Sequence, residues 1–252
     1  MKNDLYQKIY SEYLDQLGVE SNQKRHLISF EHGKNICRSP RDLNEMVLCD
    51  FGSSAIGILT NDINRFFDSI TRLKVWNEVL LPYEKQTRKN LSYAFVEPLF
   101  ESCLVSPYNI KQRFIYCGTK LRILSRTLVA GSHFQFPKDT SIQLSHLEKW
   151  VDNTVKEHNE FLNAVLSLDS TDFADGTGHY RRRKVHRIAQ HFVHGLQMDV
   201  LIEPVSGGGY SHSSVAYRPL QIATALPALL NEHKLLRSAF LKFLYFARNH
   251  FV

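Results

Sequence analysis

The feature that most constrains the fold is a long run of apolar residues at helical spacing in the first third of the chain. Between Arg41 and Tyr83, apolar side chains recur every three or four positions, which places them on one broad face of a helix. Pro40 suits the opening of such a helix, and Pro82 ends it. The face consists of Ile56, Leu59, Ile63, Phe66, Phe67, Ile70, Leu73, Trp76, Val79 and Leu80. A face this wide must be buried against other helices, so the pattern predicts a helical bundle.

The same spacing predicts helices along most of the remaining chain. The expected helices cover residues 2–17, 41–83, 84–104, 106–129, 141–168, 180–195 and 219–251. Gly18 is expected to stop the first helix, and Pro98 to kink or break the third. Ser106-Pro107 is expected to open the fourth helix, and Pro227 to bend the last. Residues 19–40 form a connector, 134–140 a loop and 169–179 a turn region.

Towards the end of the chain the apolar period changes. Residues 197–205 and 213–217 predict two short strands, joined by a turn that contains Gly207, Gly208 and Gly209. We therefore expect a mainly α fold: a helical bundle with a small β-hairpin insertion near residues 197–217. The expected organisation is a single domain overall, with an N-terminal helix and connector at 1–40 and the bundle at 41–252.

Composition and charge favour a globular protein with an acidic partner. Of the 252 residues, 43% are hydrophobic and 22% charged, a mixture that can form a packed core. The net charge of +6 favours nucleic acid or nucleotide, although a modest positive charge also serves solubility alone. The longest uncharged apolar run, Ile222 to Leu230, is too short to span a bilayer, and the start lacks the apolar core of a signal peptide. The cytoplasm is the expected location.

The four cysteines are expected to be buried, reduced thiols. They are widely spaced and form no CxxC pair, so neither a zinc ribbon nor a redox motif is indicated. They are Cys37, Cys49, Cys103 and Cys117.

The stretch from Tyr180 to His194 is the most unusual in the chain. Five cationic side chains fall within seven positions, namely Arg181, Arg182, Arg183, Lys184 and Arg187. Because these charges repel one another, they either face solvent or meet phosphate. Within this stretch, Arg181 can hold a phosphate, and His186 can remove a proton from a ribose 2′-hydroxyl or protonate a leaving oxygen. Together they suffice for metal-independent RNA cleavage through a cyclic phosphate.

Tyr180-Arg181-x4-His186 resembles the Arg-x4–6-His motif of the HEPN superfamily. Its members are small helical bundles, and many are RNases in toxin–antitoxin, abortive-infection and CRISPR systems. The resemblance implies that Arg181 and His186 are catalytic, that no cofactor is needed, and that two protomers pair so that both motifs line one cleft. A partner from a phage-defence or antitoxin system is implied too. In the family a polar, non-basic residue often follows the arginine, whereas Arg182 stands here.

Spacing alone does not select this pair. Four Arg-x4–6-His spacings occur: Arg25–His32, Arg126–His133, Arg181–His186 and Arg187–His194. Arg181–His186 is preferred because it follows a turn at the opening of a late helix.

The alternative function is a non-catalytic nucleic-acid-binding or regulatory subunit of a defence, plasmid or phage system, in which Arg182, Arg183, Lys184 and Arg187 guide the phosphate backbone. A third reading, a metal-dependent hydrolase built on His186, His191 and His194, is set aside because His186 points away from the other two on a helix.

A second basic zone spans Ser102 to Lys138 and contains no acidic residue. Lys111, Arg122 and Arg126 fall near one helical face and are interleaved in sequence with aromatic residues. Cations beside aromatic rings suit a single-stranded nucleic acid, with charge on the backbone and rings for stacking. The equally good alternative is that the rings belong to the core and the charges to solvent.

Overall fold

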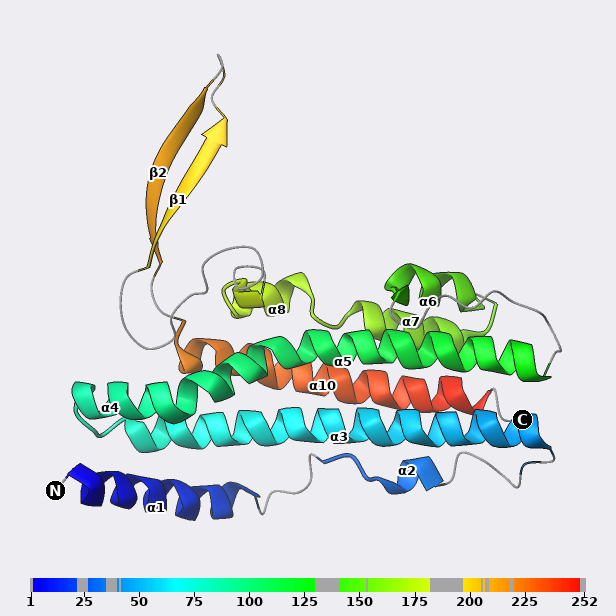
Figure 1. Cartoon of the computed structure of the whole chain (residues 1–252), viewed down its shortest axis with the longest axis horizontal. Coiled ribbons are helices and arrows are strands. Elements are labelled where there is room, and N and C mark those ends of the chain that lie inside the picture. Colours follow the sequence, from blue (N-terminus) through cyan, green and yellow to red (C-terminus); the bar gives the residue numbers. More distant parts are fainter. Residues whose placement is uncertain are drawn as a thin grey trace. The chain divides into compact units, whose positions relative to one another are not determined.

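The computed structural model describes residues 2–21, 27–34, 40, 42–129, 141–152, 154–181, 197–204, 206, 209–217 and 220–249. The mainly α fold expected from the sequence is confirmed (Figure 1). The α-helices are α1 (Lys2–Ser21), α2 (Glu31–Lys34), α3 (Leu43–Leu80), α4 (Lys85–Leu91), α5 (Glu97–Leu124), α6 (Leu144–Trp150), α7 (Lys156–Leu166), α8 (Thr171–Gly176) and α10 (Ile222–Arg248). Two π-helical segments, η2 (Ser92–Val96) and η3 (Ser125–Val129), flank α5.

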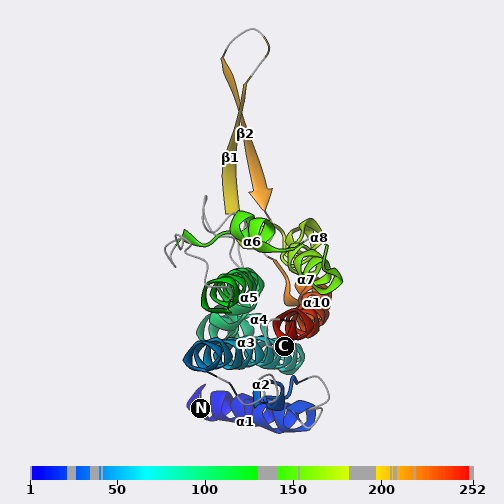
Figure 2. The same ribbon diagram turned by 90° about the vertical axis from the view of Figure 1, so that its right-hand side faces the viewer.

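The expected hairpin is present. Strands β1 (Gln197–Pro204) and β2 (Tyr210–Tyr217) pair antiparallel, with Gln197 opposite Tyr217 and Pro204 opposite Tyr210. The second strand is three residues longer at its start than the sequence predicts, and the two strands twist about each other (Figures 1 and 2).

The chain folds into two compact units, each assembled from three separate stretches. Unit 1 comprises Met1–Gln23, Ser69–Val105 and Thr171–Leu229, and unit 2 comprises Lys24–Asp68, Ser106–Ser170 and Leu230–Val252. The single domain with an N-terminal helix and connector, expected from the sequence, stays a prediction. Within the part of the chain that the structure describes, no helix combines the length and apolarity needed to cross a bilayer.

Aromatic packing forms the centre of unit 2. Phe161 on α7 has its ring centroid 5.4 Å from that of Phe243 and 4.8 Å from that of Phe246, and all three side chains are fully buried. Gly118 on α5 allows this packing, because a Cβ there would lie 2.6 Å from Cε1 of Phe161. The close approach explains why a glycine is tolerated inside a long helix.

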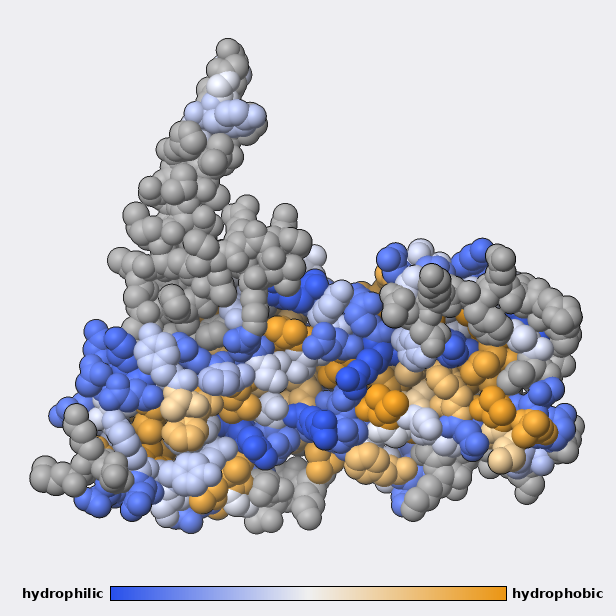
Figure 3. Space-filling view, viewed as in Figure 1, coloured by the Kyte–Doolittle hydropathy of each residue, from blue (hydrophilic) through white to orange (hydrophobic). Residues whose placement is uncertain are grey.

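An aromatic stack joins three helical segments of unit 1. Tyr13 on α1 stacks on Trp76 of α3 with ring centroids 4.1 Å apart, and Phe95 of η2 stacks on the same indole at 5.4 Å. Phe95 is 45% exposed, so the stack reaches the surface at one end. Other large apolar side chains are also exposed, and Figure 3 shows apolar and polar residues interspersed on the face in view.

Five features of the helices differ from the sequence-based expectation. The first helix runs through Gly18 to Ser21. Pro107 does not open a helix but lies inside α5, where its side chain is buried. The helix does not break at Pro98. The hydrogen bonding changes instead from π-helical in η2 to α-helical in α5, and Pro98, near the start of α5, has no N–H to donate. The turn region at 169–179 contains the short helix α8.

The fifth difference is that the helix expected over 141–168 is two helices, α6 and α7. Val151 has an extended backbone, with φ −69° and ψ 134°. The Asp152 carboxylate accepts hydrogen bonds from the Thr154 backbone N–H at 3.0 Å and from its hydroxyl at 2.6 Å. Such local bonding by an aspartate competes with helical pairing and stabilises a turn.

Candidate nucleic-acid interface

The site best defined by the structure lies in unit 2, where the end of α5 and η3 meet the end of α6. Arg122 and Arg126 are four positions apart and come from α5 and η3. The Arg122 Nε donates to the Trp150 carbonyl oxygen at 3.3 Å, and the Arg126 guanidinium lies over the Trp150 ring, 5.6 Å from its centroid. Thus two of the three cations predicted in the second basic zone meet at one tryptophan.

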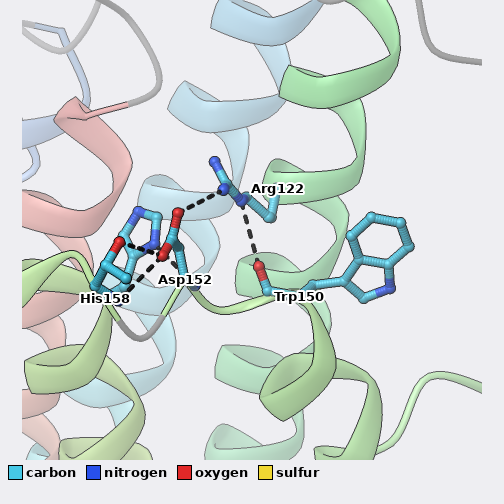
Figure 4. A network of polar contacts seen from close by, with 5 residues as sticks. Arg122, Trp150, Asp152 and His158 are labelled. Atoms are coloured by element: carbon cyan, nitrogen blue, oxygen red, sulfur yellow. Dashed lines mark hydrogen bonds and ion pairs between the residues drawn. The ribbon is translucent and has the colours of Figure 1, made fainter.

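Asp152 partly balances the positive charge of this site. Its Oδ2 lies 3.8 Å from Nη2 of Arg122, as Figure 4 shows. The hydrogen bonds from Thr154 lower the pKa of Asp152, and the charge of Arg122 adds to this effect, so the carboxylate stays ionised at neutral pH. Asp152 therefore offsets part of the charge of Arg122.

The pKa of Arg122 is lowered, first by burial and then by the positive charge of Arg126. The two guanidinium groups thus raise each other's electrostatic energy. Among the described residues, Arg126 has no carboxylate partner. An anion bound between them would relieve this repulsion.

His158 on α7 bonds to the backbone of Asp152 in this site. Its side chain is 2% exposed, and its Nδ1 accepts a hydrogen bond from the Asp152 backbone N–H at 3.2 Å. Burial lowers the pKa of His158, and the nearby Arg122 lowers it further, so the ring is neutral at pH 7. A neutral, buried imidazole that accepts a backbone hydrogen bond fixes the turn between α6 and α7.

The third predicted cation of the zone, Lys111, lies in different surroundings. Its Nζ donates to the Leu168 carbonyl oxygen at 2.5 Å. On the neighbouring peptide, the Asp169 N–H donates to Oε1 of Glu232 at 2.8 Å. Glu232 is 1% exposed, and burial raises its pKa to about 7, an effect that the charge of Lys111 reduces. Lys111 therefore has a structural contact of its own, and its role in binding nucleic acid stays a prediction.

The first basic stretch is described only at its start. Tyr180 and Arg181 are helical and follow a turn at 177–179, Tyr180 is 2% exposed, and Arg181 is half-buried. Burial raises the pKa of Tyr180 to about 12, so the phenol is neutral and anchors the turn. The remaining site residues predicted there lie outside the described residues: Arg182, Arg183, Lys184, His186 and Arg187.

Metal and thiol chemistry find little support in the described residues. No group of three or more His, Cys, Asp or Glu side chains that could hold a metal ion occurs among them. Cys49, Cys103 and Cys117 are free thiols, and burial raises the pKa of the last two to about 12. Such thiols are protonated and unreactive at neutral pH.

Sequence reasoning found Arg122 and Arg126 but missed Trp150, Asp152 and His158. A signal for Asp152 was present, because an aspartate two residues before a threonine is typical of a turn. No protein-family model matches the chain, and no curated protein or solved structure is significantly similar to it. The HEPN resemblance thus rests on the motif at Tyr180–His186 and stays a prediction.

Proposed function

We propose that this chain acts on RNA: it binds a single strand through Arg122, Arg126 and Trp150, and cleaves RNA without a metal ion through Arg181 and His186. The reaction is of the HEPN type. A homodimer and a partner from a phage-defence or toxin–antitoxin system belong to the same proposal. The basic residues Arg182, Arg183, Lys184 and Arg187 guide the phosphate backbone.

The observation that carries the proposal is the Arg126–Trp150 pair. A guanidinium held over an indole gives a flat surface with a positive charge at its face. A nucleobase can stack on such a surface while the neighbouring phosphate meets Arg122 or Arg126. Both arginines are held by contacts with Trp150, so little side-chain freedom is lost when a strand binds.

The surroundings of Arg181 favour cleavage over binding alone. Arg181 stands in a helical turn directly after the tight turn at 177–179, and the buried Tyr180 precedes it. An arginine in a helical turn, with a histidine five positions later in the sequence, matches the spacing of the motif. Arg181 would stabilise the charge that develops on the phosphate.

Binding is tested by fluorescence anisotropy of a labelled single-stranded RNA, measured over a range of salt concentrations. Arg126→Ala is expected to weaken binding about tenfold, because a hydrogen bond to a charged group contributes roughly 1.5 kcal/mol. It should also reduce the slope of log K against log salt by about 0.7. Arg113→Ala is the matched control, since Arg113 lies on α5, directly before η3 in the chain, but is already paired with Asp62. Equal affinities for the two variants would refute the proposed surface.

The alternative, a non-catalytic binding subunit, is distinguished by cleavage. A binding subunit would show the same loss of affinity in Arg126→Ala but would leave RNA intact in the presence of EDTA. Cleavage that depends on Arg181 and His186 would exclude it.

A further inference from the structure

Two exposed aromatic rings lie side by side on the surface of unit 1. Tyr10 on α1 and Phe95 on η2 are each 45% exposed, and their ring centroids are 6.2 Å apart. Single exposed apolar residues are common on protein surfaces, whereas adjacent ones mark a candidate contact surface. These two rings therefore form a surface that a ligand could cover.

Buried rings hold this surface in place. Phe95 stacks on Trp76 with centroids 5.4 Å apart and an interplanar angle of 15°, and Trp76 stacks on Tyr13 at 4.1 Å and 11°. Trp76 and Tyr13 are only 3% and 5% exposed. One face of Phe95 is covered by the indole, so its exposed area lies on the other face and at the edge. Phe95 is thus the open end of a stack of three rings.

Hydrogen bonds fix α1 beside α4 and the residues that precede it. Asn90 Nδ2 donates to the Tyr6 hydroxyl oxygen at 3.0 Å, and the Tyr83 hydroxyl donates to Oε2 of Glu12 at 2.6 Å. Glu12 also pairs with Lys8 at 3.9 Å, so this carboxylate of α1 is already engaged. Because the rings are placed before a ligand arrives, little side-chain freedom is lost on binding.

The segment that carries Phe95 is positively charged. Lys85, Arg88 and Lys89 lie between residues 85 and 96, and no acidic residue occurs there. In the part of the chain that the structure describes, no carboxylate pairs with any of these three cations. Arg88 stands seven positions before Phe95, about two helical turns, and so lies towards the same side of the helix.

This combination fits a single-stranded nucleic acid better than an apolar protein partner. A nucleobase has a flat π-face that can continue the stack at Phe95, and its backbone supplies an anion for a guanidinium. An apolar protein surface would cover the rings but would leave Arg88 and Lys89 without an anion at the interface, and the desolvation of unpaired charges is costly. The charges therefore select the nucleic acid.

We propose that Tyr10, Phe95 and Arg88 form a second contact for single-stranded RNA, in unit 1, in addition to the surface around Trp150 in unit 2. This inference rests on the proposed function, in which the chain binds such a strand. A base stacks on the open face of Phe95 beside Tyr10, and Arg88 binds a phosphate of the same strand, with Lys89 adding to the positive potential. Because base faces and phosphates are contacted, this surface accepts any sequence.

Fluorescence anisotropy of a labelled single-stranded RNA tests this contact. Phe95→Leu removes the ring but keeps an apolar side chain, and it should weaken binding about fivefold or more. Phe95→Tyr keeps the ring and should bind as the native chain does. Arg88→Gln should reduce the slope of log K against log salt by about 0.7. Lys74→Gln is the matched control, because Lys74 also lies in unit 1 but is already paired with Glu20 at 2.9 Å.

Three results would overturn the inference, provided that thermal melts show the variants folded. Native affinity in Phe95→Leu excludes stacking on this ring. Weaker binding in Arg88→Gln together with native affinity in Phe95→Leu indicates a diffuse electrostatic attraction instead. A changed sedimentation coefficient of Phe95→Leu without RNA, at unchanged RNA affinity, indicates that the rings contact a second copy of the chain.

A second measurement uses the native chain and separates this inference from the proposed function. RNA that contains 4-thiouridine is cross-linked by ultraviolet light, and the linked peptides are identified by mass spectrometry. Links within residues 83–96 or 6–13 support the inference. Links near Trp150 with none in unit 1 overturn it and leave the proposed surface of unit 2 standing. Links in unit 1 with none near Trp150, or RNA that is bound but never cleaved, refute the proposed function while this contact stands.

Discussion

Replacing Glu232 with glutamine should change how the stability of the protein depends on pH. The carboxyl group is 1% exposed, and burial raises its pKa to about 7 from its ordinary value of 4.5. A raised pKa means that the folded state binds the proton more tightly than the unfolded state. The stabilising contribution of protonated Glu232 is therefore fully present below pH 4.5 and is lost as pH rises through 7. At about 1.4 kcal/mol per pKa unit, the loss is about 3 kcal/mol.

Glu232→Gln keeps an oxygen that can accept the Asp169 N–H and stays neutral at every pH. Urea unfolding of the native chain and of this variant, at intervals from pH 4.5 to 8.5, gives the difference in free energy of unfolding. Burial of His158 lowers its pKa, which makes stability fall as pH falls below 6.5, in the opposite direction to Glu232. Because His158 is present in both proteins, its effect cancels in the difference.

The variant should gain stability relative to the native chain as pH rises, by about 3 kcal/mol in total. Lys111→Met in the native background should steepen the pH dependence, because the charge of Lys111 lowers the pKa of Glu232. A difference between the native and Glu232→Gln proteins that stays constant from pH 4.5 to 8.5 would refute the assignment of a buried, neutral Glu232.

Two further variants test packing and charge. Gly118→Ala should destabilise the protein by about 1–3 kcal/mol in thermal or urea unfolding, because its Cβ would overlap the Phe161 ring. Gly57→Ala, where a Cβ meets nothing within 4 Å, should instead stabilise by roughly 0.5–1 kcal/mol, and equal effects would contradict this packing. Asp152→Asn should raise RNA affinity up to about fivefold, because it removes the carboxylate that competes for Arg122. Weaker binding would count against Arg122 as a phosphate contact.

Helical periodicity was enough to predict the long elements of the fold but not all of their ends. The apolar face from Ile56 to Leu80 lies on α3 as expected, because its pattern persists over several turns. Pro107 misled the prediction because a proline inside a helix is costly in isolation, by about 3 kcal/mol. Apolar residues around it are buried along α5, among them Leu104 and Ile110, and their burial can outweigh that cost.

The break between α6 and α7 could not be read from periodicity. Val151 and Val155 continue the apolar pattern, yet the hydrogen bonds between Asp152 and Thr154 end the helix. Glu232 was missed for a different reason. Its partner Asp169 is 63 positions away in the sequence, so nothing local distinguishes this glutamate from one that faces solvent.

For the site, sequence reasoning reached the cations but not their partners. Lys111, Arg122 and Arg126 lie within an acid-free basic zone that composition alone indicates. That Arg126 stacks on Trp150 while Lys111 bonds to the Leu168 carbonyl depends on how α6 and α7 fold back onto α5. These contacts distinguish Arg126, which is available to a ligand, from Lys111, which bonds to the backbone of the fold.

Cleavage of single-stranded RNA in excess EDTA is the most direct test of the central claim. The native chain is expected to leave 2′,3′-cyclic phosphate ends. His186→Ala should cut at least 100-fold more slowly while binding the RNA with unchanged affinity. Cleavage at the native rate by His186→Ala, or intact RNA with the native chain, would contradict the account.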